Sequence, residues 1–328
     1  MDIRTATEHD IPLIVELLKK SLGEELMPKS TEYWQWKHVD NPFGKSPVIL
    51  AFENDTLVGI RAFMRWQWKS AGQIFESVRA VDTATHPDYQ GRGIFKKLTL
   101  ELLDYCEREK WHFVFNTPNN NSKPGYLKMG WKEAGKLPIS IPVVHPFSMA
   151  LNMSRLKQSS IKMNDNNGQE SYLLHSGLEE LLKQNASRCK DQIITAHSVN
   201  SLLWRYKNVP VAKYFTRGLQ TGEKLNVLLV YRLKSSKAGN ELRVTDIFMD
   251  ADTYKTEVRA MLKELVKFHE ADYVTVSGLN SWLNGAGLYL RKLPVGPVVT
   301  VRNITFDAAN TLQNFHGWSP SVGDLELF

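Results

Sequence analysis

Two glycines at the start of a predicted helix are the residues of this sequence best suited to bind an anion. Residues 90–95 (QGRGIF) follow a predicted strand and open a helix. The first backbone amides of a helix have no internal partner and carry partial positive charge, so they favour a diphosphate. Gly91 and Gly93 permit close backbone approach and unusual dihedral angles, while Arg92 adds charge. A plain turn between strand and helix is the alternative interpretation of the glycines alone.

Turn signals and hydrophobic spacing predict the elements that must position this turn. Strands are expected at 2–5, 48–53, 57–66, 75–85 and 112–116, and helices at 11–22 and from Ile94 to about Cys106. The early strands form an antiparallel meander, and the pair Asn54–Asp55 is typical of a hairpin turn. Strand, glycine turn, helix and strand in that order are typical of a parallel crossover. The sequence therefore predicts an α/β (α+β) fold with a mixed sheet flanked by helices.

The glycine turn and its surroundings resemble motif A of the Gcn5-related N-acetyltransferase (GNAT) superfamily. Residues 85–94 (THPDYQGRGI) match the pattern Q/R-x-x-G-x-G/A with a preceding proline, through Pro87, Gln90 and Gly93, and Gly91 adds a second glycine to the turn. Phe95 departs from the pattern, because the family prefers a small residue there. The resemblance implies acetyl-CoA as co-substrate, bound by Thr83, Ala84, Thr85, Gln90, Gly91, Arg92, Gly93, Ile94, Phe95 and Asn116.

Residues 126–131 (YLKMGW) resemble the end of the family's motif B, at the right spacing from motif A. The resemblance implies that Asn116 contacts the pantetheine arm, that the main-chain amide of Thr83 polarises the thioester, and that Tyr126 protonates the departing thiolate. A phenol with a pKa near 10 is well matched to such a leaving group. The alternative for Tyr126 is a helix residue that packs on Trp131.

The general base is left open by the sequence. The family often has a glutamate eleven residues before the Q/R position, but this chain has Arg79 there. Asp82 and Glu76 are the nearby alternatives, although strand alternation puts Asp82 on the face opposite Thr83 unless a bulge intervenes. Multi-domain relatives that use their terminal carboxylate suggest Phe328, and a water relay without a single base is the remaining option.

The second half of the chain echoes the first. A tryptophan, a basic residue, an aromatic residue and, a few residues later, a proline occur in this order in 30–42 and again in 201–210, and each copy precedes a strand. A helix around 258–266 leads into a strand at 273–276, and 287–292 falls where Tyr126 falls in the first half. We expect two tandem GNAT-like folds: a catalytic domain at 1–155, a linker at 156–170 and a degenerate domain at 171–328. The second copy lacks the glycine pair and should not bind coenzyme A; its expected pocket or core aromatics are Trp204, Trp282 and Tyr289.

Composition excludes several other classes of protein. The net charge of +6 comes from scattered residues, which argues against nucleic-acid binding. Two cysteines form no disulfide framework, and no apolar run approaches the roughly 20 residues that span a bilayer. His86, His112 and His145 have no partner at metal-ligand spacing, so no metal is expected. We expect a cytoplasmic monomer or homodimer without nucleic-acid or membrane partners.

These observations favour an N-acetyltransferase that moves acetyl from acetyl-CoA to a primary amine by direct attack on the thioester. The acceptor is expected to be a small-molecule or peptide amine. A non-catalytic acyl-CoA binder is the first alternative, supported by Phe95 and by Arg79 in place of glutamate. A Fem-type peptidyltransferase is the second, and the intact motif A argues against it.

Overall fold

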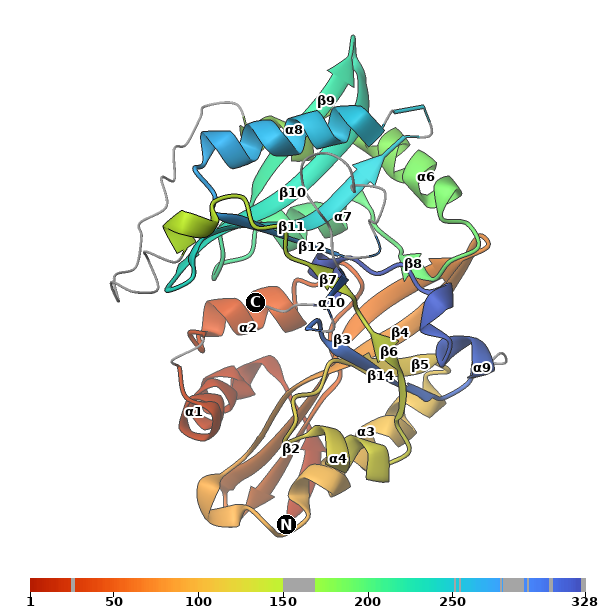
Figure 1. Cartoon of the computed structure of the whole chain (residues 1–328). Helices are drawn as coiled ribbons and strands as arrows, with labels where there is room; N and C mark the ends of the chain where they lie inside the picture. Colours follow the sequence, from red (N-terminus) through yellow and green to blue (C-terminus); the bar gives the residue numbers. More distant parts are fainter. Residues whose placement is uncertain are drawn as a thin grey trace.

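A computed structural model describes residues 1–24, 27–149, 169–250, 252–253, 255–277, 279, 292–293, 295–306 and 309–325, and Figure 1 shows it. Most of the expected linker at 156–170, together with Trp282, Tyr289 and Phe328, lies outside these residues. Within the described part of the chain, no helix is long and apolar enough to cross a bilayer.

The first half contains the elements expected from its sequence, and several begin and end at the expected residues. Its strands are β1 (Asp2–Thr5), β2 (Val48–Glu53), β3 (Thr56–Ser70), β4 (Gln73–Thr85), β5 (Phe113–Asn116), β6 (Lys132–Lys136) and β7 (Ile139–Ser140). Its helices are η1 (Glu8–Asp10), α1 (Ile11–Leu22), α2 (Thr31–His38), η2 (Pro87–Tyr89), α3 (Ile94–Arg108) and α4 (Lys123–Lys128). Asn54 and Asp55 both have positive φ, which confirms the hairpin turn between β2 and β3.

The second half repeats the central part of this order, namely helices, three antiparallel strands, a long helix and a strand, with a short additional strand between its first helices. Its strands are β8 (Ile194–Thr195), β9 (Phe215–Thr221), β10 (Lys224–Ser236), β11 (Gly239–Met249), β12 (Tyr273–Ser277), β13 (Lys292–Leu293) and β14 (Val298–Asn303). Its helices are η3 (Gln169–Leu174), α6 (Leu178–Arg188), α7 (Val199–Leu202), η4 (Leu203–Lys207), α8 (Lys255–Phe268), α9 (Ala309–Leu312), η6 (Phe315–Gly317) and α10 (Val322–Leu325). The helix and strand expected at 258–266 and 273–276 are thus confirmed as α8 and β12.

The strands form two mixed sheets. The first sheet has the order β1-β2-β3-β4-β5-β14-β6, with β8 paired to β3, and the second has the order β13-β7-β12-β11-β10-β9. In each sheet one neighbouring pair is parallel, β4 with β5 and β11 with β12. A long helix, α3 or α8, connects the two strands of that pair, as a parallel crossover requires. The α/β fold class is therefore confirmed, and the repeated order is what two copies of one fold would give.

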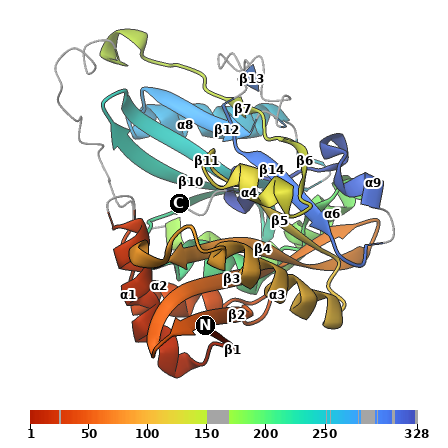
Figure 2. The ribbon, with the colours of Figure 1, turned by 90° about the horizontal axis from the view of Figure 1, so that it is seen from below.

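Each sheet contains a strand from the other half of the sequence. Strand β14 lies between β5 and β6 of the first sheet, antiparallel to both. Strand β7 pairs with β12 and β13 of the second sheet. Figure 1 shows the blue β14 among the orange and yellow strands of the first half, and Figure 2 shows the same arrangement from below. The expected boundaries at 155 and 171 divide the sequence but do not divide the sheets, so the domain limits stay a prediction.

Alternate residues of the first sheet face two separate cores. On one face, α1 and Trp34 pack against Val48 and Leu50, and on the other, α3 packs against Ile49 and Ala51. Helix α3 lies close to the sheet because β3 has glycine at position 59, where a Cβ would be only 2.5 Å from Ile94 Cγ2. This close packing fixes the start of α3, and with it the glycine turn.

The two halves meet through the tryptophans of the repeated motif. Trp36 and Trp204 are stacked with ring centroids 4.7 Å apart. Each indole Nε1 donates to the backbone carbonyl of the other tryptophan, at 2.8 and 2.7 Å. Helix α2 and helix α7, which leads into η4, begin after equivalent serines. The side-chain oxygens of Ser30 and Ser198 each accept a hydrogen bond from the backbone amide three residues further on. Trp204 is therefore a core residue at the contact between the halves.

Candidate active site

The glycine turn presents free amides at the start of a fifteen-residue helix. Gly91 and Gly93 have φ angles of 76° and 77°, a region that other residues rarely adopt. Gly93 is the residue before the first turn of α3, and no atom lies within 4 Å of where a Cβ would be at either glycine. Arg92 packs over the Tyr89 ring and donates to the Asp88 carbonyl at 3.2 Å. The turn therefore leaves exposed amides and open space, as an anion site needs.

A β-bulge lies at Asp82, a few residues before this turn. Arg61 pairs with Thr83 and Ala62 with Val81, so Asp82 is the additional residue, and its φ is 40°. The parallel ladder to β5 ends at Arg79, although β4 continues for six more residues to Thr85. The bulge removes the strict alternation that would put Asp82 and Thr83 on opposite faces. Thr83, Ala84 and Thr85 thus lie on the part of β4 that has left β5.

Asp82 is held by two side chains from the end of α2. Its carboxylate lies 2.6 Å from Lys37 Nζ and 2.8 Å from His38 Nε2. The other ring nitrogen of His38 is 2.9 Å from the Ser46 hydroxyl. Asp82 and Lys37 also line a small pocket on the α1–α2 side of the sheet, together with Val15, Leu18, Lys29, Ser30, Tyr33 and Trp34.

The electrostatics of this group make Asp82 a weak base. Burial raises the pKa of Asp82, but the charge of Lys37 and the hydrogen bond from His38 outweigh it, so its pKa lies well below the usual range. Burial lowers the pKa of His38, against the opposing effect of Asp82. At neutral pH we therefore expect an Asp82 carboxylate paired with a Lys37 ammonium, beside a neutral imidazole.

Tyr126 lies in the core on the α3 side of the same sheet. Its hydroxyl accepts a hydrogen bond of 2.8 Å from Arg61 Nη2, and Arg61 Nη1 donates to the Thr83 hydroxyl. The phenol ring packs edge-on against Phe95, 5.6 Å away, and against Trp131, 5.2 Å away. Arg61 thus joins two residues that the sequence assigned to the site. The sequence reasoning missed Arg61, although a lone arginine within the apolar run 57–64 was a usable signal.

Two predicted cofactor contacts, Phe95 and Asn116, have side chains that pack against or bond to other residues of the protein. The Phe95 ring is half-buried and packs with the core between α3 and the sheet. Its ring carbon would be 3.1 Å from a Cβ at Gly125, so it fills the space between α3 and α4. Asn116 is buried, and its side-chain oxygen accepts a hydrogen bond from the Thr300 hydroxyl of β14. A strand of the second half therefore orients this predicted cofactor contact.

Arg79 binds the end of α10. Its guanidinium donates to the backbone carbonyls of Asp324, at 2.7 Å, and of Leu325. The position where the family often has a glutamate thus holds the C-terminal helix against the first sheet. Phe328 lies outside the described residues. Glu76 is bonded to Arg65 and Gln67, and its described contacts include none of the other predicted site residues.

Strand β4 has a bulge and separates from its parallel neighbour β5, and helix α3 starts at a glycine turn directly after β4. Together these features define a GNAT-like N-acyltransferase fold. Residues 2–134 match the family model of the acetyltransferase (GNAT) domain. The first half of the chain is therefore similar to a GNAT domain in its sequence as well as in its fold. A search of curated protein sequences gives no significant match.

Solved structures with the same fold extend over nearly the whole chain. A probable N-acyltransferase of unknown function from Enterococcus faecalis V583 has a TM-score of 0.68 and 10% sequence identity, covering 93% of this chain and 73% of that one. A GCN5-related N-acetyltransferase from Anabaena variabilis ATCC 29413 has a TM-score of 0.62 and 14% identity, with coverages of 92% and 73%. Another from Kribbella flavida has a TM-score of 0.61 and 11% identity, with coverages of 93% and 71%. At these identities the likeness shows the fold alone.

Proposed function

We propose that this protein is an acetyl-CoA-dependent N-acetyltransferase whose site lies in its first half. The observation that carries the proposal is the hydrogen-bonded group of Arg61, Thr83 and Tyr126 next to the glycine turn. This group brings the predicted general acid to the strand segment predicted to contact the thioester. The exposed amides after Gly91 supply the place for the coenzyme A diphosphate.

The reaction that suits this arrangement is direct attack of a neutral primary amine on the thioester carbon. The new C–N bond forms as the C–S bond breaks, and the departing thiolate takes the proton of the Tyr126 hydroxyl. The main-chain amide of Thr83 polarises the carbonyl, a contribution of about 3 kcal/mol to the barrier for groups of this kind. The Arg61 guanidinium, 2.8 Å from the hydroxyl, would stabilise the phenolate until it regains a proton from solvent.

The proton lost by the amine has two routes in this proposal. Asp82 lies at the bulge, but its pairing with Lys37 makes it a poor final acceptor. A water relay that passes the proton beside Asp82 to solvent is therefore the better-supported route. The acceptor is proposed to be a small-molecule or peptide amine, and the protein a cytoplasmic monomer or homodimer with no metal requirement for acyl transfer.

A specific test is acetyl-CoA turnover with a panel of primary amines, measured as free thiol release and as acetylated product by mass spectrometry. Tyr126→Phe should lower kcat by about 100-fold, the effect of removing a general acid, with little change in coenzyme A affinity. Tyr105→Phe is the matched control, because Tyr105 packs on Trp111 at the other end of α3. Equal activity of Tyr126→Phe and the natural enzyme would disprove the role of Tyr126.

A non-catalytic acyl-CoA binder remains the second candidate, and one observation favours it. The carboxylate at the bulge, Asp82, is already neutralised by Lys37, which makes it a weak base. Stoichiometric acetyl-CoA binding without turnover on any amine would select this alternative. Absence of coenzyme A binding would reject both candidates.

A further inference from the structure

A separate cavity of 590 Å³ is lined mainly by the second half of the chain. Most of its walls come from α6, from β8 and the segment after it, from β11 and from residues 315–324, and Lys136 and Pro138 of the first half also line it. None of its lining residues lines the small pocket beside Asp82. The cavity is therefore a distinct feature from the candidate acetyltransferase site.

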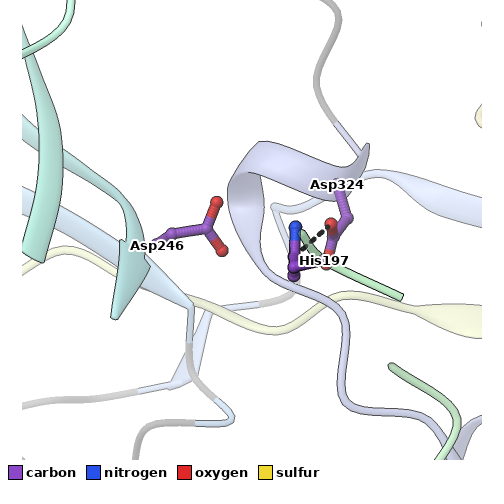
Figure 3. A group of neighbouring side chains, drawn as sticks. All are labelled: His197, Asp246 and Asp324. Carbon is purple, nitrogen blue, oxygen red and sulfur yellow. Dashed lines mark ion pairs between the residues drawn. The ribbon is translucent and has the colours of Figure 1, made fainter. Parts of the chain in front are cut away.

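Three side chains of metal-ligating type meet at this cavity. Figure 3 shows His197, which precedes α7, between Asp246 of β11 and Asp324 of α10. His197 Nε2 lies 3.4 Å from a carboxylate oxygen of Asp324. Each of the three offers one ligand atom, and these atoms all lie within 4.8 Å of one another. All three residues line the cavity, so ligand positions that they leave open would face it.

The carboxylates of Asp246 and Asp324 each accept a hydrogen bond from a group outside the cluster. The Tyr206 hydroxyl donates to Asp246, and the Ser321 backbone amide donates to Asp324 at 2.8 Å. Donors of this kind orient metal-ligating carboxylates in known sites. One oxygen of each carboxylate lies within 4.8 Å of the other two ligand atoms of the cluster.

The charges of this cluster favour a cation. Asp246 and Asp324 are 4% and 3% exposed, and no described lysine or arginine forms an ion pair with either. Buried carboxylates need a cation or a metal to offset their lost hydration. His197 is the one partner at ion-pair distance among the described residues, and it too is a metal ligand by type.

The internal repeat places this cluster at the counterpart of the candidate site. The β10–β11 ladder shifts register at Val230 and Tyr231, as the β3–β4 ladder shifts at Arg61 and Ala62. His38 and Tyr206 each lie two residues after the stacked tryptophan. His38 contacts Asp82, the additional residue of the first bulge, and Tyr206 contacts Asp246, which directly follows Thr245, the additional residue of the second bulge. The second half therefore keeps the location of the first site and changes its chemistry.

We propose that His197, Asp246 and Asp324 bind a divalent transition-metal ion. One imidazole and two carboxylates suit Zn²⁺, Mn²⁺, Fe²⁺ or Co²⁺. Two ligands bonded to one ion at about 2.1 Å each lie at most about 4.2 Å apart, so binding closes the cluster slightly. Three protein ligands leave positions for water or for an anionic group from the cavity.

The test uses the full-length protein after chelator treatment and dialysis. Titration with Co²⁺, followed by visible absorption, and with Zn²⁺, followed by calorimetry, should show one ion per chain and a rise in Tm. His197→Ala and Asp246→Asn should each weaken binding by at least about 100-fold. His316→Ala is the matched control, because His316 lines the same cavity without belonging to the cluster.

Two results would overturn the proposal: no stoichiometric binding by the natural protein, or unchanged binding in both ligand variants. Asp246→Asn keeps an oxygen acceptor for Tyr206, so its circular dichroism should match the natural protein even if His197→Ala is unstable. The readout is metal binding, and its outcome is independent of acetyl transfer in the first half.

Discussion

At the scale of single residues, Lys37 is a buried cation that is paired with Asp82. Its side chain is 6% exposed and its ammonium lies 2.6 Å from Asp82. A buried cation that loses its counter-ion pays the full cost of desolvation without compensation. Asp82 therefore stabilises the fold whatever its part in proton transfer.

Asp82→Asn should lower the free energy of unfolding by about 3 kcal/mol, because it leaves Lys37 buried without a counter-charge. Urea denaturation at neutral pH measures this change. Glu8→Gln is the control, since the exposed pair of Glu8 with Lys45 should contribute less than about 1 kcal/mol. Equal effects of the two substitutions would show that the Lys37–Asp82 pair is effectively solvated.

The same pair predicts how stability depends on pH. The pKa of Asp82 is lower in the folded than in the unfolded protein, so its contribution is complete above an unfolded pKa of about 3.9. The contribution is lost as the pH falls from there toward the folded pKa. Urea denaturation from pH 7 to pH 3 should show the gap between natural protein and Asp82→Asn shrinking below about pH 4. A constant gap would mean that Asp82 titrates alike in both states.

At the scale of elements, the start of α3 depends on a left-handed residue. Gly93 has a φ of 77° directly before the first turn, so its conformation aims the free amides of the helix. A side chain at this position strains the backbone even though space is open around it. The strain would be relieved by turning the amides away from the proposed diphosphate.

Gly93→Ala should weaken coenzyme A binding about tenfold and destabilise the fold by only about 1 kcal/mol. Calorimetric titration with coenzyme A and urea denaturation measure the two effects. Gly222→Ala is the matched control, because Gly222 also has a positive φ with open space around it but lies in the β9–β10 turn. Similar losses of affinity in both variants would contradict a diphosphate site at α3.

The elements that the sequence predicted well are those governed by local patterns. Strands β1 and β2 begin and end at the expected residues, because alternation and the Asn54–Asp55 turn are both local signals. The neighbours of β14 and β7 were not predictable, since six- and two-residue strands carry no mark of a distant partner. For the same reason, the sequence indicated Tyr126 and Asp82 but not Arg61 or Lys37, which reach them only through packing.

At the scale of the whole molecule, the two exchanged strands tie the halves together. Thr300 of β14 is buried between β5 and β6 and bonds to Asn116. Trp36 and Trp204 belong to one core cluster that also includes Trp318 and Leu325 near the end of the chain. Neither sheet is complete without residues from the other half.

The halves should therefore unfold in one transition. Hydrogen exchange in increasing urea should remove protection from the amides of β2–β4 and β9–β11 at the same denaturant concentration. A fragment of residues 1–155 should show no cooperative unfolding, because it lacks β14. Earlier loss of protection in β9–β11, or a cooperative fragment, would show that the halves are independent.

The position of β14 also has a consequence during synthesis. The chain leaves the ribosome in order from its N-terminus, so β5 and β6 emerge well before β14, the strand that lies between them in the sheet. Until then the nascent first half has two unpaired strand edges and an Asn116 without its Thr300 donor. The acetyl-CoA site proposed there thus reaches its final form only after β14 has left the ribosome, and chains truncated before β14 would be inactive and prone to aggregate.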